Sequence, residues 1–216
     1  MTASRAVLFD FDGTLADTAP DLAAAVNKLR VKRGLAALEV RDVRPYASMG
    51  ARGLLRIGFG MTPDHPDYPM LREEFLDEYS KVLSVETRLF PQMAELLNAL
   101  AARSIAWGIV TNKAMRFTER IVAALGLNPA CVVCGDSTPH LKPHPAPLLL
   151  ATQKLNLSAE RCVYVGDDLR DVQAARAAGM RSVAVEWGYH GADGDGPSSW
   201  NADALIAQPL ELLPLL

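Results

Sequence analysis

Short apolar runs alternate with amphipathic stretches along most of the chain. Within the amphipathic stretches apolar residues recur every three or four positions, the spacing of one helix face, as at Phe117, Ile121 and Leu125. This alternation is typical of a parallel sheet with helices on both faces. The predicted strands are 6–9, 105–110, 131–134, 162–165 and 181–185, with a candidate edge strand at 204–206, and the predicted helices are 92–103, 114–125, 145–155 and 169–178.

One interval, 16–88, departs from this alternation because its pattern predicts helices and no strand. Thr18, followed three residues later by Asp21, has the form of a helix start with a capping hydroxyl. Three helices are indicated: one carrying Leu22, Val26 and Leu29, one over 51–57, and one carrying Leu71, Phe75, Tyr79 and Val82. We therefore predict an α/β core formed by 1–15 and 89–216, with a Rossmann-like open parallel sheet, and an inserted all-helical cap formed by 16–88.

The composition is that of a folded globular protein and favours a small-molecule partner. Of the 216 residues, 50% are hydrophobic and 22% are charged, and the net charge is −3, which attracts neither nucleic acid nor an anionic membrane surface. No run approaches the roughly 18 apolar residues of a transmembrane helix, and the first residues lack the pattern of a signal peptide. We expect a cytoplasmic protein that is a monomer or a homodimer.

The three cysteines raise one alternative, a zinc site. Cys131 and Cys134, followed by His140 and His144, imitate a zinc-binding order. The spacer of five residues between Cys134 and His140 is shorter than the roughly 12–15 residues usual in finger-type sites. We therefore interpret these cysteines as structural thiols.

Two aspartates follow the first predicted strand. Asp10 and Asp12 are two residues apart in an extended segment, so their side chains are expected to converge on one site at the end of that strand. Paired carboxylates there can hold a hard cation, or one can attack an electrophile while the other moves protons.

Further polar residues are expected at the same edge. In an open parallel sheet, ligands bind beyond the carboxyl ends of the strands. The residues that follow other predicted strands there, or open a nearby helix, are Thr111, Asn112, Lys113, Lys142, Asp167, Asp168 and Asp171. A hydroxyl, a lysine and a second acidic cluster thus join the first aspartate pair.

Four motifs in order carry a resemblance to a known family. They are Asp10-x-Asp12-Gly13-Thr14, Thr111-Asn112-Lys113, Lys142-Pro143 and Gly166-Asp167-x-x-x-Asp171. The chain resembles the haloacid dehalogenase-like superfamily, in its phosphatase branch with a helical cap. Within that branch it is similar to phosphoglycolate phosphatases and, more closely over 50–53, 107–113 and 165–171, to N-acetylmuramic acid 6-phosphate phosphatases.

The resemblance and the chemistry together suggest roles for the aspartates. Asp10 is expected to be the nucleophile that forms an aspartyl-phosphate. Asp12 is expected to protonate the leaving alcohol and then deprotonate water, and neighbouring carboxylates would favour its protonated form. Mg²⁺ prefers oxygen ligands, and Asp10, the backbone carbonyl of Asp12, and Asp167 fit that preference.

Other residues of the motifs are expected to bind the phosphoryl group. Thr111 would supply a hydroxyl, Asn112 a backbone donor and Lys142 a compact positive charge. Backbone amides around Gly13 and Thr14 would add further donors.

Two acidic residues and one basic residue have less definite roles. Asp168 is interpreted either as a second metal contact or as a solvated neighbour. Asp171 is expected to orient a metal-bound water or Lys142. Lys113 is not expected to be catalytic, and His190 is interpreted as a loop histidine that could also approach the site.

The cap is expected to select the substrate. Arg52, in a glycine-flanked segment, is our candidate for binding a substrate carboxylate, because its planar guanidinium can do so with two hydrogen bonds. Arg41, Arg44 and Arg56 are expected to be solvated. The cap would close about hinges near 16–17 and 90–91 to exclude water.

These inferences predict a Mg²⁺-dependent phosphatase that acts on a small phosphate ester, with a carboxylate-bearing compound favoured. Three alternatives remain: a dehalogenase, which would have no use for the proton donor Asp12; a phosphomutase, which would keep both aspartates; and a non-catalytic protein of the same fold.

Overall fold

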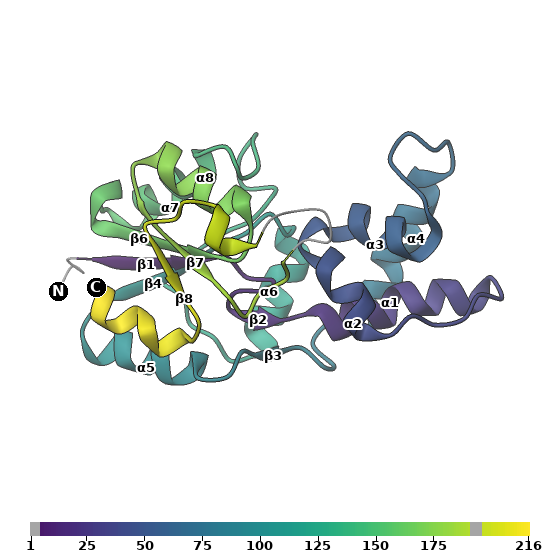
Figure 1. Cartoon of the computed structure of the whole chain (residues 1–216), viewed down its shortest axis with the longest axis horizontal. Helices are drawn as coiled ribbons and strands as arrows, with labels where there is room; N and C mark the ends of the chain where they lie inside the picture. Colours follow the sequence, from purple (N-terminus) through teal and green to yellow (C-terminus); the bar gives the residue numbers. More distant parts are fainter. Residues whose placement is uncertain (1–4, 191–195) are drawn as a thin grey trace.

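The computed structural model describes residues 5–190 and 196–216. Its centre is a six-stranded parallel sheet with the strand order β5-β4-β1-β6-β7-β8 (Figure 1). The strands are β1 (Ala6–Phe9), β4 (Ala106–Val110), β5 (Cys131–Val133), β6 (Cys162–Gly166), β7 (Arg181–Val185) and β8 (Ala204–Ile206). Each agrees with its predicted range to within one residue at either end, so the predicted sheet, including its edge strand, is confirmed.

The register of the central strands brings their carboxyl ends level. Phe9 of β1 pairs with Ile109 of β4 on one side and with Val165 of β6 on the other. The residues just beyond these strands therefore meet at one edge of the sheet. β1 itself is at most 1% exposed along its whole length, which explains why it is a continuous apolar run without alternation.

Helices cover both faces of this sheet, as predicted (Figure 1). They are α5 (Met93–Ala102), α6 (Met115–Ala124), α7 (Ala146–Leu155) and α8 (Leu169–Ala178), with the 3-10 helices η2 (Ala159–Arg161), η3 (Pro197–Ser199) and η4 (Pro209–Leu215). α5, α6 and η4 pack on one face, against Phe9 and Val165. α7 and α8 pack on the other, against Leu8 and Tyr164.

A separate group of helices lies beyond the sheet (Figure 1). It comprises α1 (Ala19–Lys32), α2 (Val40–Val43), the 3-10 helix η1 (Arg44–Met49), α3 (Gly50–Phe59) and α4 (Tyr68–Lys81). These helices share an apolar core in which Val26, Leu54 and Phe75 are at most 1% exposed. α1, α3 and α4 are the three predicted helices, whereas α2 and η1 were not predicted. No helix in the described part of the chain is long and apolar enough to cross a membrane.

Two short strands join this helical group to the sheet domain. β2 (Ala16–Asp17) and β3 (Arg88–Leu89) pair in antiparallel fashion where the chain enters and leaves the helices. The prediction that 16–88 contains no strand was therefore wrong. Two residues are too few to give a hydrophobic period, so the pattern carries no signal for them.

The start of α1 also differs from the prediction. Thr18 is the N-cap residue but makes no capping hydrogen bond through its side chain. Its hydroxyl instead donates to Asp12 Oδ1 at 2.5 Å. Asp21 accepts hydrogen bonds from the Glu86 and Thr87 amides and the Thr87 hydroxyl, so it ties α1 to the segment that precedes β3.

Candidate active site

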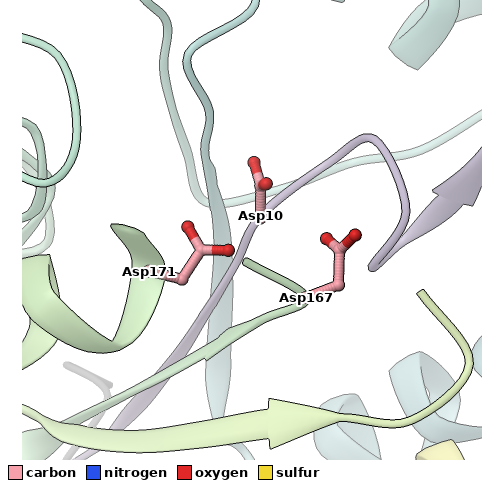
Figure 2. A group of neighbouring side chains, drawn as sticks. All are labelled: Asp10, Asp167 and Asp171. Atoms are coloured by element: carbon pink, nitrogen blue, oxygen red, sulfur yellow. The ribbon is translucent and has the colours of Figure 1, made fainter. Parts of the chain in front are cut away.

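Three carboxylates from two strand ends and one helix converge on a single point. Asp10 follows β1, Asp167 follows β6, and Asp171 lies in the first turn of α8. Figure 2 shows their side chains directed into the same space. One oxygen from each lies within 4.8 Å of the others, and all three residues are buried. The predicted convergence at the carboxyl ends of the strands is thus present for these residues.

Asp167 is a buried carboxylate, and no described cationic side chain is among its hydrogen-bond partners. Its Oδ1 accepts from the Thr14 hydroxyl at 2.7 Å, and its Oδ2 accepts from the Tyr189 amide at 2.8 Å. Burial, followed by the charges of Asp10 and Asp171, raises the pKa of Asp167 well above its usual range. A bound cation would relieve this cost of burying like charges together.

The turn after β1 holds Asp167 rather than facing the cavity. Gly13 has a φ of +86°, and a Cβ there would lie 2.2 Å from Asp167 Oδ2, so only glycine fits. The Gly13 amide donates to the Ala16 carbonyl, and Thr14 is fully buried with its hydroxyl on Asp167. The Gly13 amide and the Thr14 hydroxyl thus have partners within the protein, and phosphate binding by the backbone of this turn stays a prediction.

Lys142 is almost completely buried between two of the aspartates. Its Nζ lies 2.9 Å from Asp10 Oδ1 and 2.7 Å from Asp171 Oδ1, and it donates to the Tyr164 hydroxyl at 2.7 Å. Burial acts to lower the pKa of Lys142, but the two carboxylates outweigh it and leave the pKa raised. Lys142 therefore stays charged beside Asp10.

Asp171 is held in place from both of its oxygens. Oδ1 contacts Lys142, and Oδ2 accepts from the Asp168 amide at 3.0 Å. Of its two predicted roles, orienting Lys142 is the one that these contacts match. Burial above all raises the pKa of Asp171 to about 7, although Lys142 acts in the opposite direction.

Thr111 and Asn112 follow β4 at the same edge. Thr111 is 3% exposed and lines the cavity. Asn112 exchanges two hydrogen bonds with the backbone of Lys142: Nδ2 donates to the carbonyl at 3.0 Å, and Oδ1 accepts from the amide at 2.9 Å. The Asn112 side chain thus fixes the loop that carries Lys142.

Asp12 has an unexpected partner in Lys113. Lys113 Nζ lies 2.9 Å from Asp12 Oδ1, and this buried ammonium also lies 4.8 Å from the centre of the Tyr79 ring of α4. Burial acts to lower the pKa of Lys113, but Asp12 and Tyr79 outweigh it and the pKa is raised. Sequence reasoning set Lys113 aside and expected carboxylates beside Asp12. It missed this ion pair because the position of a strand end does not specify which side chains pair at that edge of the sheet.

Asp168 is a partly exposed residue whose carboxylate is bound by Arg170. Its carboxylate caps α8 by accepting from the Arg170 amide, and it also pairs with the Arg170 guanidinium at 2.7 and 2.8 Å. Arg170 in turn donates to the backbone carbonyl of Ser48 in η1 at 2.9 Å. The pair therefore links the sheet domain to the helical group. Asp168 lies outside the metal-binding cluster found among the described residues.

A cavity of about 320 Å³ opens above Asp10. Asp10, Asp12, Thr111 and Lys142 line its floor, and residues of α1, η1 and α3, including Arg52, line the facing side. Arg52 lies in the first turn of α3 rather than in a loop, and its exposed side chain borders the cavity as predicted.

Of the three other arginines of the helical group that were predicted to be solvated, only one is highly exposed. The Arg41 side chain is 86% exposed, in agreement with the prediction. Arg44 contradicts it by pairing with both oxygens of Asp17, at 2.9 and 2.8 Å. Arg56 lies 5.5 Å from the centre of the Tyr46 ring and is half-buried. Charge alone did not distinguish these arginines, because their contacts come from distant parts of the chain.

The remaining candidates lie away from this cavity. Cys131 and Cys134 are buried free thiols, whereas His140 and His144 are exposed and stack on each other at 4.3 Å. The interpretation as structural thiols fits this arrangement. His190 contacts the Glu186 carbonyl, so it is a loop histidine.

The residues present fit a divalent metal ion. Asp10 Oδ1 accepts no directed hydrogen bond from any described group, although Lys142 lies beside it. The donors to Asp167 in the described part of the chain, from Thr14, Ser48 and Tyr189, are all neutral. Oxygen ligands of this kind are those that Mg²⁺ prefers, completed by water and phosphate oxygens. Asp10 and Asp167 would hold the ion, with the Asp12 carbonyl as the predicted third ligand.

Comparison with known proteins identifies the class to which this fold and site belong. The chain matches the family of haloacid dehalogenase-like hydrolases over residues 7–185, and it belongs to that family. It is 44% identical to the N-acetylmuramic acid 6-phosphate phosphatase of Pseudomonas putida, over 96% of this chain and 94% of that protein. It is also 44% identical to a phosphoglycolate phosphatase of Xanthomonas campestris pv. campestris, over 98% and 96% respectively.

Solved structures agree with this assignment. A predicted phosphoglycolate phosphatase from Haemophilus somnus 129PT has a TM-score of 0.85 and 27% identity, and the match covers 100% of this chain and 99% of that one. The resemblance stated from the four motifs, the fold class and the enzyme class, a phosphatase, are confirmed.

Proposed function

We propose that this chain is a Mg²⁺-dependent phosphomonoester hydrolase that acts through an aspartyl-phosphate on a small, carboxylate-bearing phosphate. N-acetylmuramic acid 6-phosphate and 2-phosphoglycolate are the two candidate substrates, from the names of its relatives. The observation that carries the proposal is the position of Asp10. It lies at the cavity floor, 2.9 Å from the Lys142 ammonium and in the carboxylate cluster with Asp167.

In the first step, an oxygen of Asp10 attacks phosphorus and the bond from phosphorus to the substrate oxygen breaks. Asp12 gives its proton to the departing alkoxide, which leaves as an alcohol. Lys142 stays charged and offsets negative charge on the phosphoryl oxygens, and the Thr111 hydroxyl donates to one of them. Bound Mg²⁺ would supply further charge neutralisation between nucleophile and phosphate.

In the second step, water attacks the phosphorus of the aspartyl-phosphate. Asp12, now ionised, takes a proton from this water, and the bond between phosphorus and the Asp10 oxygen breaks to release phosphate. Hydrogen bonding to the Thr18 hydroxyl and pairing with Lys113 would hold the ionised Asp12 in place for this step. The ionised form of Asp12 thus has a hydrogen-bond donor and a cation already in contact with it.

The cap is proposed to select the substrate and to exclude water. We keep 16–88 as its extent and 16–17 and 90–91 as its hinges. The first hinge coincides with β2 and the second directly follows β3. Closure would bring Arg52 over the cavity, where its guanidinium would bind the substrate carboxylate.

Phosphate release with and without Mg²⁺ tests the proposal. The substrates are 2-phosphoglycolate, N-acetylmuramic acid 6-phosphate and hexose phosphates without a carboxylate, with Asp10→Asn as the inactive control. We expect one carboxylated substrate to lead in kcat/KM, EDTA to abolish turnover, and Asp10→Asn to be inactive. Isomerised sugar phosphate without free phosphate would instead indicate a phosphomutase, and no product from any substrate would contradict the proposal.

Arg52→Ala tests the carboxylate contact. Loss of a charge-assisted pair should raise KM for the carboxylated substrate about ten- to hundredfold, with little change for a hexose phosphate. Arg41→Ala, which removes an exposed arginine of the same helical group, is the matched control. An equal effect of Arg52→Ala on both substrate types would exclude a contact with the carboxylate.

A further inference from the structure

Tyr189 is a fully buried residue at the connection between the sheet domain and the helical group. It follows β7 and is 1% exposed. Its hydroxyl donates to Asp17 Oδ1 at 2.7 Å and accepts from the Thr18 and Ala19 amides at 2.7 and 2.9 Å. One side-chain oxygen therefore accepts from the amide of the N-cap residue and from the first amide of α1, neither of which has a partner within the helix.

The ring of Tyr189 contacts both crossings between the two parts of the molecule. On one side the Arg44 guanidinium, which pairs with Asp17, lies 5.5 Å from the ring centre. On the other, Phe90 packs against it with ring centres 6.3 Å apart. Phe90 follows β3, where the chain returns to the sheet domain. Tyr189 thus touches the outgoing segment, the returning segment and η1.

The backbone of Tyr189 reaches the carboxylate cluster directly. Its amide donates to Asp167 Oδ2 at 2.8 Å. The preceding Gly188 lies so close that a Cβ there would be 2.1 Å from the Cβ of Asp167. This segment cannot shift relative to Asp167 without breaking the hydrogen bond, and it cannot move closer because the backbone already abuts the side chain.

The Tyr189 hydroxyl also holds the backbone of Thr18. It accepts from the Thr18 amide, and the Thr18 hydroxyl in turn donates to Asp12 Oδ1. Tyr189 therefore has one connection to Asp167, directly through its own amide, and a second to Asp12, through Thr18 at the start of α1.

We propose that Tyr189 is a positioning residue that couples the seating of the cap on the sheet domain to the placement of Asp167 and Asp12. The inference rests on the proposed function for its catalytic consequence only. Independently of catalysis, the proposal states that metal binding at Asp167 favours an ordered segment at Asp17–Ala19. By thermodynamic linkage, an ordered segment then favours metal binding to the same extent.

Hydrogen–deuterium exchange of peptides covering 16–22 measures this coupling without substrate. In the wild-type chain, saturating Mg²⁺ is expected to slow exchange of the Thr18 and Ala19 amides. In Tyr189→Phe these amides should exchange about five- to tenfold faster, since they lose their acceptor, and Mg²⁺ should no longer slow them. Tyr68→Phe, a change to another buried tyrosine in the helical group, should behave as wild type.

Kinetics and metal binding complete the test. Tyr189→Phe should lower kcat about tenfold with little change in KM, and calorimetry should show weaker Mg²⁺ binding, whereas Tyr68→Phe should change neither.

Wild-type amides that do not respond to Mg²⁺ would overturn the inference even if Tyr189→Phe failed to fold. A Mg²⁺ response retained in folded Tyr189→Phe would overturn it equally. Failure of the proposed function would appear separately, as wild-type protein that releases no phosphate.

Discussion

Lys113 is the residue whose environment changes the interpretation of the site most. Its ammonium lies between the Asp12 carboxylate and the face of the Tyr79 ring, and its side chain is 8% exposed. A buried cation at this position compensates the charge of Asp12, and it also contacts the ring of Tyr79, which belongs to α4. The pair therefore joins a candidate proton-transfer group to the cap.

Replacing Lys113 by methionine should impair turnover more than binding. Asp12 would lose its cationic partner, and we expect kcat to fall about ten- to hundredfold while KM changes little. Steady-state kinetics on the preferred substrate measure this effect. Lys154→Met, at an exposed position, is the matched control. A Lys113→Met variant with normal kcat would mean that the ion pair has no part in turnover.

The sequence was informative about residues that follow strands and uninformative about residues that pair across the fold. Asp10, Thr111 and Asp167 could be brought together in advance because parallel strands in register end at one edge. The pairing of Lys113 with Asp12 and the contacts of Tyr189 could not be predicted, because strand order places residues at an edge without specifying which side chains pair there.

At the scale of elements, α1 is fixed to the returning chain by one carboxylate. Asp21 is 1% exposed and accepts three hydrogen bonds from Glu86 and Thr87. Sequence reasoning interpreted this acid as part of a helix cap, since an acid three residues after a threonine is the usual signature. The local pattern was present, but the side chains of Thr18 and Asp21 form hydrogen bonds with residues outside the helix instead.

Asp21→Ala should therefore destabilise the protein. Three donors, two of them on buried Thr87, would lose their acceptor, and we expect the free energy of unfolding to fall by about 2–4 kcal/mol. Urea denaturation of the metal-free protein measures the change. Asp77→Ala, at an exposed position on α4, should stay within about 0.5 kcal/mol of wild type. Similar effects of the two substitutions would show that Asp21 is not a tie of this kind.

The elements were predictable where an apolar run or a helical period marked them. The six strands of the sheet have only three to five residues each, but apolar runs between helical patterns indicated them, and their bounds agreed closely. The β2–β3 pair and the short helices α2 and η1 have neither mark. Their formation depends on the pairing and packing of neighbouring segments rather than on a repeating pattern.

At the scale of the whole molecule, the carboxylate cluster should make stability depend on pH and on metal together. The pKa of Asp171 is raised to about 7 and that of Asp167 is also raised, from ordinary values near 4. The metal-free folded state then binds protons more tightly than the unfolded state, so its stability should fall as the pH rises from about 4 to about 7.

Mg²⁺ should reverse this loss, because it competes with protons for the same oxygens. At a concentration about a hundredfold above its dissociation constant, it should raise Tm by about 5–10 °C at pH 8. The increase should be much smaller at pH 5. Differential scanning calorimetry with and without EDTA measures both values, with Asp167→Asn as the variant that should not respond. Equal increases at the two pH values would contradict this account.

The three buried cysteines have a practical consequence for experiments on this molecule. Burial above all raises the pKa of Cys131, Cys134 and Cys162 to about 11, so at neutral pH they are protonated thiols out of reach of alkylating reagents. The chain has no other cysteine. A single cysteine introduced on the helical group, for example by Leu35→Cys at a position 42% exposed, would be the only thiol to react in the folded state. A fluorophore could then be attached there with the native cysteines left in place. The slow rate at which the three native cysteines are labelled would measure how often the core opens.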